Sequence, residues 1–231
     1  MTDINFIEFD KTSNLLEFTF PDLNDLDNIT NELVQQVTMW LTARPEDKNG
    51  EFEIGIIDKK YHIPSYNEKL FVWLNQCLQT AGNFYFPRKS ELKFAICDSW
   101  MTRSMSASTA SSHSHQHSHL TGILYLTDNT SQTIFEIIPR EIDFYSESIG
   151  FTSDYEKIAV PSVKGKLVIY PSRLRHRVRV LPGQKNIRYT YIFNSYATGV
   201  ISSLSSSYLE YNVKDIKQRF EDGMAKLKLN N

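Results

Sequence analysis

"HSHQHSHLTGILYLTD", residues 113–128, joins a polar tract directly to an apolar one. Its first half carries a histidine at every second position, His113, His115, His117 and His119. Its second half is a short apolar run that ends in Thr-Asp, a pattern typical of a β-strand. In a strand, residues two apart point to the same side, about 6 to 7 Å from each other along the chain. The tract can therefore aim two imidazoles at one metal ion, provided that another ligand comes from elsewhere in the chain.

Further short stretches share this strand-like composition and are separated by polar or turn-forming segments. We expect them to pair as antiparallel strands, so that residues 91–200 form a sandwich or a barrel. These stretches are "LKFAICDSWMTRS" (92–104), "TIFEIIP" (133–139), "KGKLVIYPS" (164–172) and "NIRYTYIFNSY" (186–196).

Helical patterns flank this β region on both sides. Apolar residues recur at helical spacing from Ile29 to Leu41, and "SYNEKLFVWLNQCLQTAG" opens on Ser65, a residue able to cap a helix, and closes at Gly82. The tail "YLEYNVKDIKQRFEDGMAKLKL" (208–229) has the pattern of one more amphipathic helix. We expect a single α+β domain over residues 1–231, with a strand and supporting helices in 1–90, a β core in 91–200 and a C-terminal helix in 201–231.

The composition excludes several classes of protein. A net charge of −2 with 41% hydrophobic residues gives no reason to expect a nucleic-acid or membrane partner. No window approaches the roughly 18 apolar residues of a membrane span. Acidic residues stand where a secretory signal would be basic, and Cys77 and Cys97 form no spacing motif. We therefore expect a cytoplasmic protein; its oligomeric state stays open, a homodimer included.

A third histidine and an arginine stand out downstream. In "YPSRLRHRVRV" (170–180), His176 alternates with a row of arginines and falls on the apolar side of the strand. Taken alone, a histidine there is more often a core residue than a ligand. Arg188 lies in a strand filled on both faces, and a buried guanidinium requires an anion. That anion is either a structural Asp or Glu or the carboxylate of a small molecule.

Four motifs in order then resemble the 2-oxoglutarate- and Fe(II)-dependent oxygenases, in particular a group found in bacteria and their phages. The motifs are "CDSWMTRS" (97–104), "HSHQHSHLTGILYL" (113–126), "YPSRLRHRV" (170–178) and "RYTYIFN" (188–194), within residues 95–196. That group carries His-x-His, a Ser/Thr-Gly pair before a strand, a P-S-x-L-x-H-x-V segment and a closing strand that ends in Phe-Asn. The resemblance implies a double-stranded β-helix, the jelly-roll or cupin-like barrel.

The resemblance also implies a metal site. His113 and His176 match the family's first and last iron ligands, and His115 stands where the usual ligand is Asp or Glu. An imidazole at that place removes one negative charge from the site. Two shifted registers, His115 with His117 or His117 with His119, remain open.

The co-substrate residues follow from the same match. Arg188 corresponds to the arginine that binds the distal carboxylate of 2-oxoglutarate, and Thr190 to a hydroxyl that assists it. Tyr125 falls where some relatives place a tyrosine on this carboxylate. Tyr125 has the parity of His113 and His115, so a continuous strand would turn all three inward.

The implied activity is that of an Fe(II)- and 2-oxoglutarate-dependent dioxygenase. Such an enzyme would use O2 to hydroxylate a small molecule or peptide, would release succinate and CO2, and needs no catalytic side chain beyond the metal site. It would work in the host cytoplasm if the chain is phage-encoded. One alternative is a cupin-like three-histidine metalloprotein that does not use 2-oxoglutarate. The other is a non-catalytic barrel that serves as a binding module.

Overall fold

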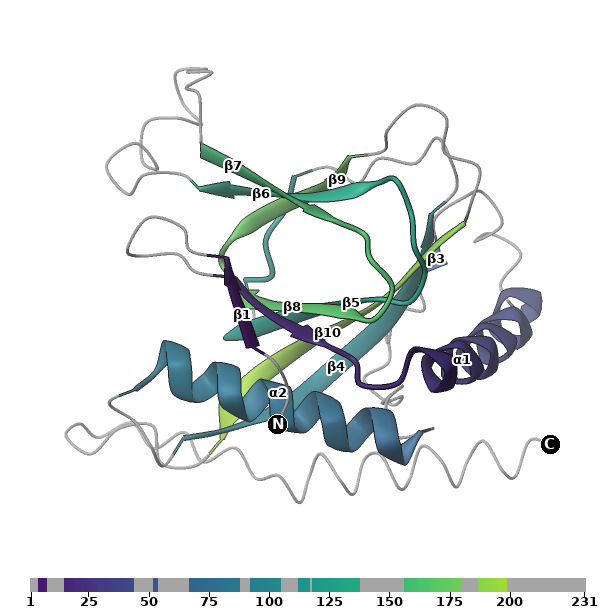
Figure 1. The fold of residues 1–231 in the computed structure, drawn as a ribbon, viewed down its shortest axis with the longest axis horizontal. Helices are drawn as coiled ribbons and strands as arrows, with labels where there is room; N and C mark the ends of the chain where they lie inside the picture. The colour runs from purple at the N-terminus through teal and green to yellow at the C-terminus, as the bar shows by residue number, and fades with distance from the viewer. Residues whose placement is uncertain are drawn as a thin grey trace.

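A computed structural model gives the fold, and it describes residues 4–7, 15–43, 52–53, 67–87, 92–104, 112–116, 118–137, 156–179 and 187–198. Two antiparallel sheets face each other (Figure 1). The larger has the order β1-β2-β8-β5-β10-β4-β3 and the smaller the order β7-β6-β9. The strands are β1 (Ile4–Ile7), β2 (Leu15–Thr19), β3 (Phe52–Glu53), β4 (Lys93–Ser104), β5 (Leu120–Tyr125), β6 (Gln132–Ile137), β7 (Glu156–Pro161), β8 (Lys166–Pro171), β9 (Arg175–Arg179) and β10 (Arg188–Thr198).

The chain passes repeatedly from one sheet to the other, which produces the jelly roll. It leaves the larger sheet after β4, touches the smaller sheet at His113 through an isolated bridge to His176, and returns to the larger sheet as β5. β6 and β7 belong to the smaller sheet, β8 to the larger, β9 to the smaller and β10 to the larger. The predicted mainly-β, jelly-roll core is thus confirmed.

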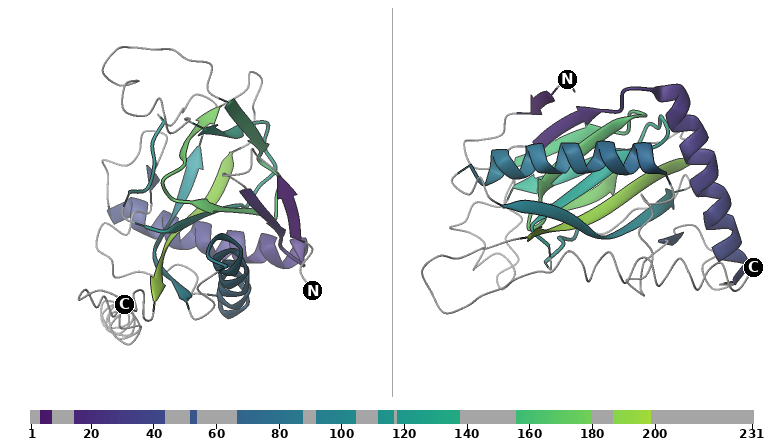
Figure 2. Two further views of the ribbon diagram at one scale, coloured as in Figure 1. Left: turned by 90° about the vertical axis from the view of Figure 1, so that its left-hand side faces the viewer. Right: turned by 90° about the horizontal axis from the view of Figure 1, so that it is seen from below.

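Two helices cover the outer face of the larger sheet, α1 (Leu23–Ala43) and α2 (Glu68–Tyr85) (Figures 1 and 2). The predicted supporting helices are therefore present. Asn67, and not Ser65, caps α2, because its side-chain oxygen accepts a hydrogen bond from the Leu70 amide at 3.0 Å. α2 also continues past Gly82, which lies against the ring of Phe94; a Cβ at Gly82 would come within 2.4 Å of that ring. Gly82 is a packing residue and does not end the helix.

The apolar residues form two clusters. One lies between the helices and the larger sheet and includes Leu74 and Phe193. The other lies between the two sheets and includes Tyr125, Phe135 and Tyr170. The second cluster is the interior of the jelly roll, and the site described below lies against it.

A β-bulge interrupts the pairing of β4 with β10. Asn194 pairs with Asp98, but the next residue, Ser195, pairs with Ile96, so that Cys97 is the extra residue. An extra residue reverses which side chains face which side of the sheet. Ile96 before the bulge and Met101 after it both belong to the cluster beneath the helices, although their parities differ.

Gly122 allows β5 to lie close against the side chain of Phe193 on β10. The two residues are direct partners in the ladder, and a Cβ at Gly122 would stand 2.2 Å from Cζ of the Phe193 ring. Because this ring is fully buried, it has little room to move away. The packing explains the glycine of the Thr-Gly pair.

Two expectations can be compared with the described residues only in part. The helix expected within 201–231 lies outside them. Among the helical residues that are described, none forms a segment with the length and apolar character that crossing a membrane requires.

Candidate metal centre

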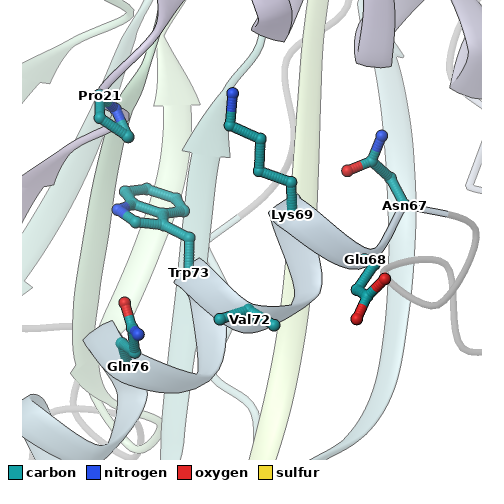
Figure 3. A pocket seen from close by; sticks show the side chains of 7 residues that line it. All are labelled: Pro21, Asn67, Glu68, Lys69, Val72, Trp73 and Gln76. Carbon is teal, nitrogen blue, oxygen red and sulfur yellow. The ribbon is translucent and has the colours of Figure 1, made fainter.

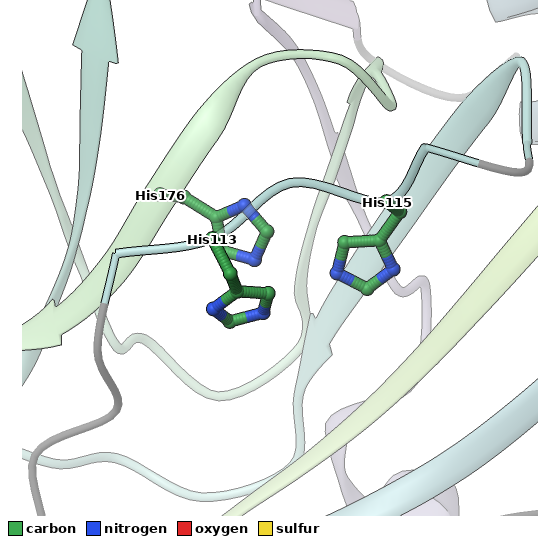
Figure 4. A group of neighbouring side chains, drawn as sticks. All are labelled: His113, His115 and His176. Atoms are coloured by element: carbon green, nitrogen blue, oxygen red, sulfur yellow. The ribbon is translucent and has the colours of Figure 1, made fainter. Parts of the chain in front are cut away.

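Three of the histidines converge between the sheets (Figure 4). His113 and His176 exchange backbone hydrogen bonds across their bridge, at 3.0 and 2.9 Å. His115 lies in the segment that follows, where its amide donates to the Ser172 carbonyl at 2.9 Å. Each residue offers one ring nitrogen, and the three nitrogens lie within 4.8 Å of one another. The structure thus brings together the three predicted ligands from two distant segments.

Burial keeps two of these imidazoles neutral. Burial, with a smaller contribution from the neighbouring His113, lowers the pKa of His176 to about 3 and the pKa of His115 to about 4. A neutral imidazole offers a lone pair, the form that binds a metal. Nε2 of His115 is buried and has no hydrogen-bond partner, while its Nδ1 lies 2.8 Å from Oδ1 of Asn194. A bound ion would give this buried nitrogen a partner, so the residues fit a metal.

The donor set suits a transition metal such as Fe(II). Imidazole is a ligand for iron, zinc, copper and nickel, whereas magnesium and calcium prefer oxygen. Within the described part of the chain, His113, His115 and His176 form the group of potential metal ligands. Three protein ligands leave coordination positions open for other molecules.

Aromatic side chains surround the histidines. Trp100 from β4 stacks on His115, with ring centroids 5.4 Å apart and planes at 11°. Phe135 and Tyr170 flank His176, and the Tyr170 hydroxyl lies 3.3 Å from its Nε2. Sequence reasoning missed Tyr170, although its place six residues before His176 in the "YPSRLRH" segment is a possible signal.

Arg188 is buried inside the jelly roll, with only 3% of its surface exposed. Its Nε donates to Oγ of Ser162 at 3.0 Å and its Nη2 donates to Oγ1 of Thr133 at 3.3 Å. The guanidinium also lies over the ring of Tyr125, 5.5 Å from the centroid, and the Tyr125 hydroxyl donates to Thr133 at 2.7 Å. Thr190 is fully buried, and its hydroxyl is hydrogen-bonded to that of Thr102. Of the residues predicted to bind the co-substrate, Tyr125 contacts the Arg188 guanidinium in the structure, and Thr190 lies two residues from Arg188 on β10. The contacts of Arg188 with Thr133 on β6 and with Ser162 just after β7 were not predicted from the sequence.

Strand β6 gives the spacing between this arginine and the histidines. Phe135 of β6 pairs directly with His176, and Thr133, which Arg188 contacts, lies two residues along the same strand. Two residues of a strand span about 7 Å. The guanidinium therefore lies within reach of a short dicarboxylate whose other end is beside His176.

The predicted continuous strand from His113 to Tyr125 was wrong. Residues 114–116, 118 and 119 are not part of a strand, and β5 begins only at Leu120. Tyr125 faces inward all the same because β5 has its own register with β10. His119 lies elsewhere, with Nδ1 accepting from the Ala197 amide at 3.3 Å and its ring edge-on to Tyr196. His117 lies outside the described residues.

A separate groove of about 600 Å³ lies at the start of α2 (Figure 3). Figure 1 shows that α2 lies on the face of the larger sheet that is turned away from the smaller sheet. Pro21, Lys69 and Trp73 are among the residues that line it, and the Lys69 ammonium lies 2.6 Å from Asp25. The helix and the sheet separate this groove from the histidines, so it is not part of the metal centre.

Comparison with known proteins finds a family that resembles the part of the chain around this site. Residues 98–194 match the model of a family described as "Putative 2OG-Fe(II) oxygenase". The matched residues cover less than half of the chain, and over this core the chain is similar to the 2OG-Fe(II) oxygenases. The match begins at the β-bulge, ends at Asn194, and contains all three histidines and Arg188. The name of this family refers to iron and 2-oxoglutarate, and the three histidines that could hold a metal ion lie within the matched residues. No curated protein matches the chain.

Solved structures share the fold of this chain at low sequence identity. The non-heme alpha ketoglutarate dependent carbocyclase SnoK from nogalamycin biosynthesis has 13% identity and a TM-score of 0.56, over 88% of this chain and 91% of that one. AviO1 from Streptomyces viridochromogenes Tue57 has 8% identity and a TM-score of 0.56, over 86% and 94%. The epimerase SnoN, in complex with Fe3+, alpha ketoglutarate and nogalamycin RO, has 10% identity and a TM-score of 0.50, over 84% and 88%. At such identities the likeness shows the fold alone.

Proposed function

We propose that the chain is an Fe(II)- and 2-oxoglutarate-dependent dioxygenase that hydroxylates a small molecule or a peptide and releases succinate and CO2. His113, His115 and His176 hold the iron. The observation that carries this proposal is the convergence of three imidazoles, one with a buried and unpartnered Nε2, beside a buried arginine.

The side chains have distinct roles in this reaction. When bound, Fe(II) and 2-oxoglutarate together supply the oxidising chemistry that activates O2. The protein contributes three imidazoles as ligands. The lowered pKa values of His115 and His176 keep these two imidazoles neutral and able to bind a metal. Phe135 and Tyr170 cover one side of His176 with buried rings, which excludes water from that side.

Arg188 binds the distal carboxylate of 2-oxoglutarate. Its guanidinium can accept that anion in a bidentate manner, and the hydroxyls of Thr133 and Ser162 already contact it. Tyr125 covers the guanidinium, and Thr190 lies two residues along β10 on the same face. The site thus offers one positive charge inside a low-dielectric barrel, where the attraction for a carboxylate is stronger than in water.

A second consequence follows from the ligand set. Three neutral histidines leave both charges of the ferrous ion uncompensated by protein, whereas the usual Asp or Glu would cancel one. We infer that the anionic co-substrate binds this site more tightly than a site with a carboxylate ligand. Neither Cys77 nor Cys97 forms a disulfide, which supports a cytoplasmic location, where thiols stay reduced.

Anaerobic titration tests the proposal. The wild-type protein receives Fe(II) and then 2-oxoglutarate, and binding of both produces a weak charge-transfer band in the visible spectrum. His176→Ala should abolish metal binding. Arg188→Ala should leave metal affinity unchanged but weaken 2-oxoglutarate binding by at least about tenfold, the value of one charge-assisted hydrogen bond.

The alternatives predict other outcomes. A three-histidine metalloprotein without 2-oxoglutarate would bind iron, but the oxo-acid would change neither its spectrum nor its melting temperature. A non-catalytic barrel would bind neither, and His176→Ala would then lower only its stability.

A further inference from the structure

Three motif residues outside the metal ligands meet at His115. They are Thr121 of the Thr-Gly pair, Ser172 of the P-S segment and Asn194 of the closing Phe-Asn, and they lie on or just after β5, β8 and β10. These strands are neighbours in the larger sheet: Asn194 pairs with Thr121, and Thr121 pairs with Tyr170, two residues before Ser172. Thr121 and Ser172 are fully buried, so their hydroxyls must find partners within the protein.

Their hydroxyls form a chain with one consistent direction. The Ser118 hydroxyl donates to Oγ of Ser172 at 2.5 Å. Ser172 Oγ lies 2.8 Å from Oγ1 of Thr121, and Thr121 donates to Oδ1 of Asn194 at 3.0 Å. Each hydroxyl carries a single proton, so with these two donations fixed, Ser172 donates to Thr121. The chain ends on the side-chain oxygen of Asn194, which makes this oxygen the acceptor that faces His115.

The acceptor determines the tautomer of His115. Oδ1 of Asn194 lies 2.8 Å from Nδ1 of His115, and because this oxygen can only accept, Nδ1 must carry the proton. In a neutral imidazole the other nitrogen then has the lone pair. That nitrogen is Nε2, which is buried and without a hydrogen-bond partner. The opposite tautomer would place a proton on the atom that is needed for the metal.

We propose that Asn194, oriented by the hydroxyls of Ser118, Ser172 and Thr121, is a positioning residue that holds His115 in its metal-binding tautomer. This inference rests on the proposed function, since it takes His115 as an iron ligand. Asn194 would act through His115, whose Nδ1 it contacts. The usual carboxylate ligand needs no tautomer control, so the asparagine serves a need that arises with histidine at position 115.

The test compares three variants by anaerobic Co(II) titration, with the absorption of bound Co(II) as the readout. Asn194→Leu removes the acceptor and should weaken Co(II) binding by about 10- to 100-fold, the usual effect of losing such a partner of a metal ligand. Asn194→Asp keeps an acceptor and should bind Co(II) at least as tightly as wild type. Ser195→Ala is the matched control, because the neighbouring hydroxyl donates to the Leu120 carbonyl on the other face of β10. It should bind Co(II) with wild-type affinity.

A second readout separates positioning from a general structural role. ¹⁵N chemical shifts of the imidazoles in the metal-free protein report which nitrogen of His115 carries the proton. We expect the proton on Nδ1 in wild type and Asn194→Asp, and a shift of population toward Nε2 in Asn194→Leu. Should Asn194→Leu not fold, Thr121→Val replaces it, with a loss of Co(II) affinity of about 2- to 10-fold for one hydrogen bond.

Unchanged Co(II) affinity in Asn194→Leu, or equal losses in Asn194→Leu and Asn194→Asp, would overturn the inference while leaving the oxygenase intact. A wild-type protein that binds no Co(II) would instead overturn the proposed function. The two failures are therefore distinguishable in one series of titrations.

Discussion

Acid should destabilise the metal-free protein, and His176 should account for a defined share of the loss. The pKa of His176 is about 3 in the folded chain against an ordinary value of 6.5. Below pH 6.5 the unfolded chain binds a proton at this residue while the folded chain does not, so the free energy of unfolding falls as the pH falls toward the folded pKa. The slope is about 1.4 kcal/mol per pH unit, which gives a loss of about 2 kcal/mol from His176 at about pH 5. His115, with a pKa of about 4, should add a similar loss.

Urea unfolding in the presence of a chelator measures these losses. The wild type should lose about 4 kcal/mol of unfolding free energy between about pH 7.5 and pH 5 through the two histidines, and His176→Leu only about 2 kcal/mol. Ile134→Val, a buried substitution on β6 without an ionisable group, serves as control and should lower stability equally at both pH values. If His176→Leu retains the full acid dependence of the wild type, His176 is not held neutral by burial, and the electrostatic reasoning fails.

Further predictions concern the ligand set, the core and the co-substrate pocket. His115→Asp supplies the missing carboxylate, a harder ligand, and should shift metal preference from Ni(II) toward Mn(II) in competition dialysis; an unchanged ratio would mean that His115 does not bind the metal. Gly122→Ala forces a Cβ to within 2.2 Å of the buried Phe193 ring and should cost about 1 to 3 kcal/mol in chemical denaturation. A cost near zero would show that the ring moves freely. Thr133→Val removes a hydroxyl that contacts both Arg188 and Tyr125. It should raise the Kd for 2-oxoglutarate by about 2- to 10-fold and leave Co(II) affinity unchanged, whereas a change in Co(II) affinity alone would contradict the assigned pocket.

Local sequence patterns were sufficient to predict the principal strands and the inward orientation of His176. The alternation in "RLRHRVRV" places His176 inward, and His176 is indeed 5% exposed while Arg179 is exposed. The strand composition of residues 120–126 and 186–196 likewise predicted β5 and β10. These signals survive because each depends on side chains only two residues apart, whose relation is fixed by the geometry of a single strand.

The rest depends on how distant segments pair, which a single sequence does not determine. Asn194 and Thr121 are 73 positions apart and become neighbours only through the register of β5 with β10. Ser162 reaches Arg188 from a turn between β7 and β8. The parity argument that linked His113 to Tyr125 failed for the same reason, since the residues that are described between His113 and Leu120 are not in a strand. Periodicity is informative only within one unbroken element.

The extra residue at Cys97 has an evolutionary consequence. Removing it would restore regular pairing of β4 with β10. The side chains in the downstream half of β4 would then all change to the opposite face of the sheet. Trp100 would leave His115 and turn toward the helices, and Met101 would turn toward the histidines. Substitutions along β4 can therefore change, one at a time, the side chains that face the histidines. A single-codon deletion there would turn the core-facing side chains of β4 toward the histidines. This stretch should therefore tolerate amino-acid substitutions far better than any change in length.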